Sequence, residues 1–141
     1  MQIRSSLRHI LIASTLALIA FSETALTDQY PPSVTDLLEQ AGADCASFDS
    51  GEFSYTAQAV QRWELTGDAP MEWLIDGSQF ACSTAASLWG GTGGAQLWVV
   101  VEGRSPIEFL AHQWQVVDMY GQPLLLLAVH SSECSDTVGP C

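Results

Sequence analysis

The sequence contains no lysine, and its only arginines beyond the N-terminal segment are Arg62 and Arg104. Carboxylates are abundant instead, and the 16 aspartates and glutamates give the 141-residue chain a formal net charge of −12. Because a nucleic-acid backbone has to be met by cationic side chains, this composition argues against nucleic acid as a partner. The acidity itself has two interpretations: a cationic partner attracted by the long-range field, or solubility in a salty environment.

Long apolar runs are also missing, except for one near the N-terminus. Basic residues precede the uncharged segment 10–21, and the small residue Ser22 then offers a cleavage point. This order is typical of a secretory signal peptide, and the segment is shorter than the roughly 20 residues that a membrane-spanning helix needs. We therefore expect residues 1–26 to be signal peptide and leader, and residues 27–141 to form a single exported β-rich domain, periplasmic or secreted, with no membrane span after cleavage.

No C-x-x-C pair occurs, and the wide cysteine spacings argue against a zinc site. In an exported chain, four cysteines predict disulfide bonds instead, and three pairings are possible. Turn-forming Gly139 and Pro140 lie between the last two cysteines and can bring them together. The pairing that we predict, with no free thiol, is Cys45 with Cys82 and Cys134 with Cys141.

The pattern of apolar residues indicates the fold class. A helical spacing begins after Pro32, at Val34, Leu37, Leu38 and Ala41. Ser33 and Asp36 match a capping box and Gly42 supplies a stop, which predicts an amphipathic helix of about nine residues. From Phe53 onward the period becomes two, as in half-buried antiparallel strands. The sequence thus predicts an α+β, mainly β fold, in which one N-terminal amphipathic helix packs on an antiparallel β meander.

The strand signals are clearest in the second half of the chain. Gly103 and Gly121 mark tight turns, and a bulge is expected at His112. Because the segment 124–129 (LLLLAV) is apolar on both faces, we expect it to be a central strand covered on one side by the helix. No internal repeat is visible, which argues against a complete propeller or solenoid. The expected strands span residues 59–65, 71–76, 95–101, 107–111, 114–119 and 124–129.

The most distinctive motif is ELTGDAPMEWLID at residues 64–76. It resembles the D-x-[DN]-G-D-G-x-x-D-x-x-x-D loop of secreted FG-GAP and VCBS-type repeats, in which oxygen ligands surround calcium and glycine allows the turn. Ala69 stands where the turn glycine belongs and Pro70 follows it, so we expect calcium to bind weakly or not at all. The metal ligands that the resemblance implies are Glu64, Thr66, Asp68 and Glu72.

The segment 87–95 (SLWGGTGGA) carries a second resemblance. Together with the helix, the loop and the β pattern around it, it is similar to a group of small uncharacterised exported bacterial proteins with a SLFCGTGGC-like segment. The resemblance covers most of residues 34–138 and implies a fold and an exported location, but no activity. Those proteins have two cysteines where this chain has Gly90 and Ala95, as expected if one disulfide had been lost. The glycines lack the Gly-Lys-Ser/Thr continuation of a phosphate loop, which favours a tight loop between strands.

The five tryptophans could form a platform for a carbohydrate or a peptide. In a domain of this size most of them are expected in the core, since each carries a large apolar ring. Trp98 is the candidate for exposure, because the strand pattern places it on one face with Gln96 and Glu102.

Catalytic signals are sparse. No G-x-S-x-G motif is present. His130 is next to Ser131 in the sequence, but adjacency in sequence does not place a histidine base against a serine nucleophile. We therefore hypothesise a non-enzymatic exported binding or accessory module, with a cationic protein or an envelope component as its partner and no cofactor other than weakly bound calcium. Two alternatives stay open: a calcium-stabilised structural or adhesion-type domain, and a small hydrolase in which His112 or His130 meets a serine or carboxylate across strands.

Overall fold

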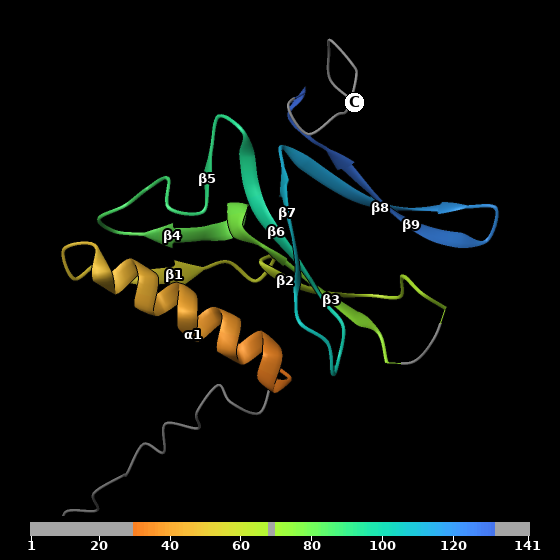
Figure 1. Cartoon of the computed structure of the whole chain (residues 1–141), viewed down its shortest axis with the longest axis horizontal. Helices are drawn as coiled ribbons and strands as arrows, with labels where there is room; N and C mark the ends of the chain where they lie inside the picture. Colours follow the sequence, from red (N-terminus) through yellow and green to blue (C-terminus); the bar gives the residue numbers. More distant parts are fainter. Residues whose placement is uncertain (1–29, 68–69, 132–141) are drawn as a thin grey trace, which may run out of the picture.

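The computed structural model describes residues 30–67 and 70–131, shown in colour in Figure 1. These residues form an α+β, mainly β fold, so the predicted fold class is confirmed. The predicted signal peptide, Asp68, Cys134 and Cys141 lie outside the described residues. The elements are α1 (Pro32–Ser47), β1 (Phe53–Tyr55), β2 (Val60–Trp63), β3 (Glu72–Asp76), the 3₁₀ helix η2 (Gly77–Gln79), β4 (Phe80–Cys82), β5 (Gly90–Gly91), β6 (Gly94–Val100), β7 (Ile107–Ala111), β8 (Gln113–Met119) and β9 (Gln122–Ala128).

The described strands pair antiparallel in three groups. The largest sheet has the order β2-β3-β6-β5, with β7 paired along the opposite edge of β6, while β1 pairs with β4 and β8 with β9. The predicted strands therefore exist, although the chain leaves the main sheet after β7. Over the residues described, no helix is both long and apolar enough to span a membrane.

The helix α1 is longer than predicted and begins differently. It runs for 16 residues, its N-cap is Pro31 without a side-chain hydrogen bond, and Gly42 lies inside it. Both the Ser33 cap and the Gly42 stop were therefore wrong. The buried face continues past Gly42 to Cys45, and packing of such a face outweighs the roughly 1 kcal/mol that a helical glycine costs.

An aromatic cluster lies under the helix. Val34, Leu38 and Ala41 of α1 belong to the same buried core as Phe80 and Trp89. Phe80 is the centre of this cluster, with ring centroids 5.1 Å from Phe53, 5.3 Å from Trp89 and 5.9 Å from Trp98. Edge-on and offset ring contacts of this kind fix the orientation of each ring. The prediction that the helix packs on the strands by its apolar face is thus confirmed.

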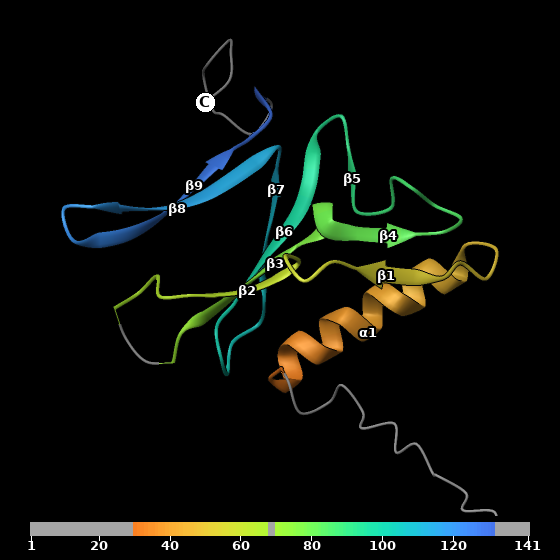
Figure 2. The ribbon, with the colours of Figure 1, turned by 180° about the vertical axis from the view of Figure 1, so that it is seen from behind.

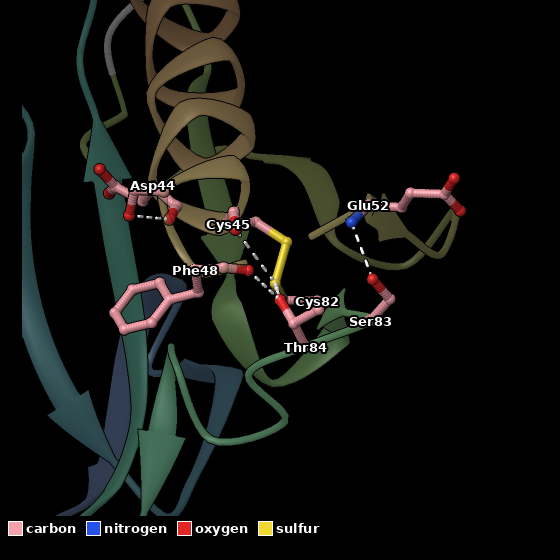
Figure 3. Close-up of a disulfide and its surroundings, with 8 residues drawn as sticks. Asp44, Cys45, Phe48, Glu52, Cys82, Ser83 and Thr84 are labelled. Carbon is pink, nitrogen blue, oxygen red and sulfur yellow. Dashed lines mark hydrogen bonds between the residues drawn. A yellow bond between two sulfur atoms is a disulfide. The ribbon is translucent and has the colours of Figure 1, made fainter. Parts of the chain in front are cut away.

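A disulfide joins the last turn of α1 to β4 (Figure 3). Cys45 and Cys82 are 37 positions apart in the sequence and their Cα atoms are 5.5 Å apart, so this predicted pair is confirmed. Around it, the Thr84 hydroxyl donates to the Phe48 carbonyl, and the Glu52 N–H donates to Ser83 Oγ at 2.8 Å. These bonds fasten the end of the helix to the segment after β4. The predicted bond between Cys134 and Cys141 stays a prediction.

The segment 124–129 is not a central strand, which corrects the sequence-based expectation. β9 pairs with β8 in a two-stranded hairpin, and Figures 1 and 2 both show this hairpin projecting from the body on the side away from α1. The change of direction falls at His112, where a bulge was expected. Its N–H donates to the Ala128 carbonyl at 2.7 Å, so β8 starts a new pairing with β9 and none with β7.

The glycine-rich segment forms a tight hairpin between β5 and β6, as the absence of phosphate-loop spacing suggested. Gly90 and Ala95 are opposite each other in it, and a Cβ added at Gly90 would lie 3.3 Å from the Ala95 Cβ. Cysteines in disulfides have Cβ atoms about 3.5–4.5 Å apart. The geometry therefore fits a position where a disulfide could be replaced by a glycine and an alanine together.

Candidate functional site

The loop that resembles a calcium site uses its best-placed carboxylate internally. Glu72 is only 2% exposed. Its Oε2 accepts the Leu65 N–H at 2.9 Å and its Oε1 accepts the Thr66 hydroxyl at 2.7 Å. Glu64 Oε1 in turn accepts the Gly67 N–H at 2.8 Å. These carboxylates therefore close the loop between β2 and β3 by hydrogen bonding, and a calcium ion would have to displace those donors.

The predicted metal ligands are only partly brought together. Glu64, Thr66 and Glu72 lie in one hydrogen-bonded loop, and Asp68 lies outside the described residues. Among the residues whose placement is given, no group of three or more histidine, cysteine, aspartate or glutamate side chains could hold a metal ion. That calcium binds weakly or not at all stays a prediction.

Burial works to raise the pKa of the Glu72 carboxyl. Hydrogen bonds from the Thr66 hydroxyl, the Leu65 N–H and the backbone N–H of Glu72 outweigh that effect and hold the pKa below its ordinary value of 4.5. Because the folded-state pKa lies below that of the unfolded chain, the ionised carboxylate stabilises the fold fully above about pH 4.5. This contribution is lost as the pH falls through the folded-state pKa.

Glu72→Gln is expected to lower the free energy of unfolding at pH 7 by about 1–3 kcal/mol, because a neutral amide replaces a carboxylate that accepts charge-assisted hydrogen bonds. Urea denaturation between pH 7 and pH 3 measures this, and the variant should lose less stability on acidification than the wild type. Glu64→Gln is the control, since its carboxylate is exposed and the Gly67 N–H can bond to an amide oxygen. Equal losses in both variants would contradict the account.

The structure brings the two histidines of the hydrolase alternative together. The rings of His112 and His130 have centroids 6.2 Å apart. Asp76 lines the same pocket as His112, but its two oxygens accept the Ser78 N–H and the Trp114 indole N–H, each at 2.9 Å. This carboxylate therefore holds the base of the β8–β9 hairpin against the main sheet.

A different place combines acidic and aromatic side chains: an open groove between α1 and the β6–β7 pair, with a volume of about 600 Å³. We call it the acidic groove. Its size lies within the range of ligand pockets, about 300–1,000 Å³. It is lined by Ser33, Asp36, Leu37, Gln40, Ala41, Asp44, Trp89, Gln96, Trp98, Pro106 and Glu108.

One wall of the acidic groove is a polar row along α1. Asp36, Gln40 and Asp44 are spaced by four residues, which places them on one line along the helix. Gln40 Nε2 donates to Asp44 Oδ1 at 2.8 Å. At 1.5 Å per residue, the two aspartates are about 12 Å apart along the helix axis. The wall therefore presents two separate carboxylates.

The opposite wall and the floor come from the main sheet. Glu108 of β7 is the register partner of Trp98 in β6, and its Oε1 accepts Gln96 Nε2 at 2.8 Å. Trp98 is half-buried and Trp89 is buried. Both rings pack against Phe80, which fixes them. A third carboxylate thus stands beside a rigid aromatic surface.

Among the residues that the structure describes, no cationic side chain lines the acidic groove. The described residues hold just two arginines, Arg62 and Arg104, and the guanidinium of Arg62 lies over the Trp73 ring at 5.1 Å. The three groove carboxylates are therefore not neutralised by an arginine or lysine in the groove itself. A groove lined by both carboxylates and indole rings attracts organic cations, both by charge and by the ring quadrupole.

Sequence reasoning found part of this groove. It placed Trp98 and Gln96 on one exposed face, and both line the groove, whereas Glu102 does not. It missed Asp36, Asp44 and Glu108, because their proximity depends on how α1 lies across the sheet. The four-residue spacing of the polar residues on α1, next to its apolar face, is the signal that was available.

Comparison with known proteins gave no match: no family model, no curated protein and no solved structure matches this chain. The resemblances to exported proteins and to FG-GAP and VCBS-type loops therefore stay predictions.

Proposed function

We propose that this protein is an exported, non-enzymatic binding module whose acidic groove takes up arginine side chains of a cationic partner protein. The observation that carries the proposal is that Asp36, Asp44 and Glu108 line one groove together with Trp98, the register partner of Glu108. Export is supported by the signal-like segment 10–21 and agrees with a disulfide, a bond that persists in oxidising compartments. A periplasmic or secreted location follows from this proposal.

Arginine fits the groove better than lysine for two reasons. Its planar guanidinium can stack on an indole ring such as that of Trp98, and it can donate two parallel hydrogen bonds to one carboxylate. A lysine ammonium is a compact, strongly hydrated point charge, so it gains less from an aromatic floor. The net charge of −12 would add long-range attraction for any basic partner.

The spacing of the carboxylates suggests the spacing of the arginines. In an extended peptide, residues four positions apart lie about 13 Å apart and point to the same side. This matches the roughly 12 Å between Asp36 and Asp44 along α1. The preferred ligand is therefore an extended segment with two arginines separated by three residues.

Isothermal titration calorimetry tests this preference. Two acetylated and amidated peptides of identical composition are compared, Arg-Gly-Ser-Gly-Arg and Gly-Arg-Arg-Ser-Gly. The first should bind more tightly at about 50 mM salt, and its binding should weaken at about 500 mM salt, because exposed charges are screened. Equal affinity for both peptides would contradict the proposed spacing, and absence of binding would contradict the proposed function.

Asp36→Asn and Glu108→Gln are each expected to weaken binding of the first peptide about two- to fivefold, as expected for loss of one partly exposed ion pair. Glu39→Gln is the matched control, since it removes the same charge from α1 at an exposed position that does not line the groove. An equal loss in the control would indicate non-specific attraction by the net charge.

A further inference from the structure

The β8–β9 hairpin carries four of the eight large apolar side chains that are exposed in the described structure. Leu124 is 40% exposed, Met119 47%, Leu126 48% and Tyr120 100%. The register pairs Val117 with Leu124, so Val117, Met119, Leu124 and Leu126 alternate onto one face with Tyr120 at the turn. We call these five residues the hairpin face.

The hairpin has little support from the rest of the molecule. Figures 1 and 2 show it projecting beyond the main sheet, and its bonds to the body lie at its base, from the Trp114 indole to Asp76 and from the His112 N–H to Ala128. A two-stranded hairpin by itself is marginally stable in water, and it usually needs a further apolar layer. The face that would receive such a layer is the exposed one.

We propose that two copies of this chain associate by packing their hairpin faces together across a two-fold axis. Charge supports a second copy as the occupant. The strands β8 and β9 contain a single charged residue, Asp118, which pairs with Pro123 on the opposite face and accepts the Gly121 N–H at 3.1 Å. Two chains of net charge −12 repel over most of their surface, and the hairpin face is where they can meet without bringing carboxylates together.

The available area sets the strength of the association. Tyr120 offers on the order of 200 Å². Each of the three partly exposed Leu and Met side chains offers less than about 100 Å², so two copies together would bury at most roughly 1,000 Å² from these residues alone. Stable interfaces bury about 1,200–2,000 Å², and smaller ones are weak or transient. The expected dimer therefore forms at micromolar concentrations and not at nanomolar ones.

Sedimentation equilibrium tests this proposal, using protein expressed from the whole sequence, purified after export and measured from about 1 to 200 μM. The wild type should pass from monomer to dimer, and Leu126→Glu should weaken the dimer at least tenfold, since it places a charge within the apolar contact. Ile107→Glu is the matched control: this side chain is 52% exposed on β7, outside the hairpin, and its replacement should leave dimerisation unchanged. Higher salt should strengthen the dimer, opposite to its effect on peptide binding in the acidic groove.

Circular dichroism shows whether Leu126→Glu stays folded. If this variant is unfolded, the proposal is tested on the wild type alone. The melting temperature of a dimer rises with protein concentration, so the wild-type melting temperature should increase over this concentration range. A wild type that is monomeric at 200 μM, or a dimer that Leu126→Glu leaves intact, overturns the proposal. If the protein stays monomeric and co-floats with phosphatidylcholine vesicles, and Leu126→Glu abolishes this co-flotation, the hairpin face binds a lipid surface and the dimer proposal is wrong.

Discussion

Replacing Cys45 and Cys82 together by alanine is expected to lower the free energy of unfolding by about 4 kcal/mol at 25 °C. The two residues are 37 positions apart, and a cross-link that closes a loop of this length removes much of the conformational entropy of the unfolded chain. Domains of this size are stable by about 5–15 kcal/mol, so the loss is a large part of the total. The helix α1 should be affected most, since the bond fastens its last turn to β4.

Urea denaturation of the double variant measures this loss. Cys134→Ala with Cys141→Ala is the comparison, because the predicted bond between them closes a much shorter segment and should contribute only about 2.5 kcal/mol on the same entropy argument. A loss below about 1 kcal/mol on removal of Cys45 and Cys82 would show that the covalent link to α1 is not a main source of stability.

Gly94→Ala is expected to cost about 3–5 kcal/mol, the other large effect on stability. Gly94 has a φ of +117°, which residues with a Cβ rarely adopt. A Cβ there would also lie 2.5 Å from the Ala111 carbonyl carbon and 2.9 Å from the His112 N. Both the backbone strain and the overlap with β7 have to be relieved by moving the strands apart, and each costs on the order of 1–3 kcal/mol.

Gly91→Ala is the matched control for this substitution. Gly91 belongs to the same hairpin and pairs with Gly94, but nothing lies within 4 Å of a Cβ added there. Its replacement should change the free energy of unfolding by less than about 1 kcal/mol. Similar losses for the two variants, measured by thermal or urea denaturation, would show that the close approach of β6 to β7 does not determine the cost.

The local part of the fold could be predicted from the sequence. The alternation in β3 and β6 follows from a period of two and needs no knowledge of the partner strand. Gly103 and Gly121 do adopt positive φ at turns, as their positions suggested. The pairing of Cys45 with Cys82 followed from the turn formers beside the other two cysteines.

The long-range part could not be predicted in this way. The apolar run in β9 is compatible both with a central strand and with an exposed hairpin. Periodicity shows which residues share a face of the strand, but not whether another element covers that face. Gly42 did not end the helix, because burial of Cys45 one turn later stabilises the continued helix. The acidic groove depends on the distance between α1 and β7, which are about 60 residues apart, and no local pattern encodes that distance.

The indole N–H signals in a ¹H–¹⁵N correlation spectrum test the proposed function most directly. The chain has five tryptophans, and of these Trp89 and Trp98 line the acidic groove while Trp114 lines the pocket at the base of the β8–β9 hairpin. On titration with the Arg-Gly-Ser-Gly-Arg peptide, the Trp98 signal should shift in a saturable way and the Trp114 signal should stay in place. Saturable shifts at Trp114 with none at Trp98, or no saturable shift at any indole, would contradict the account.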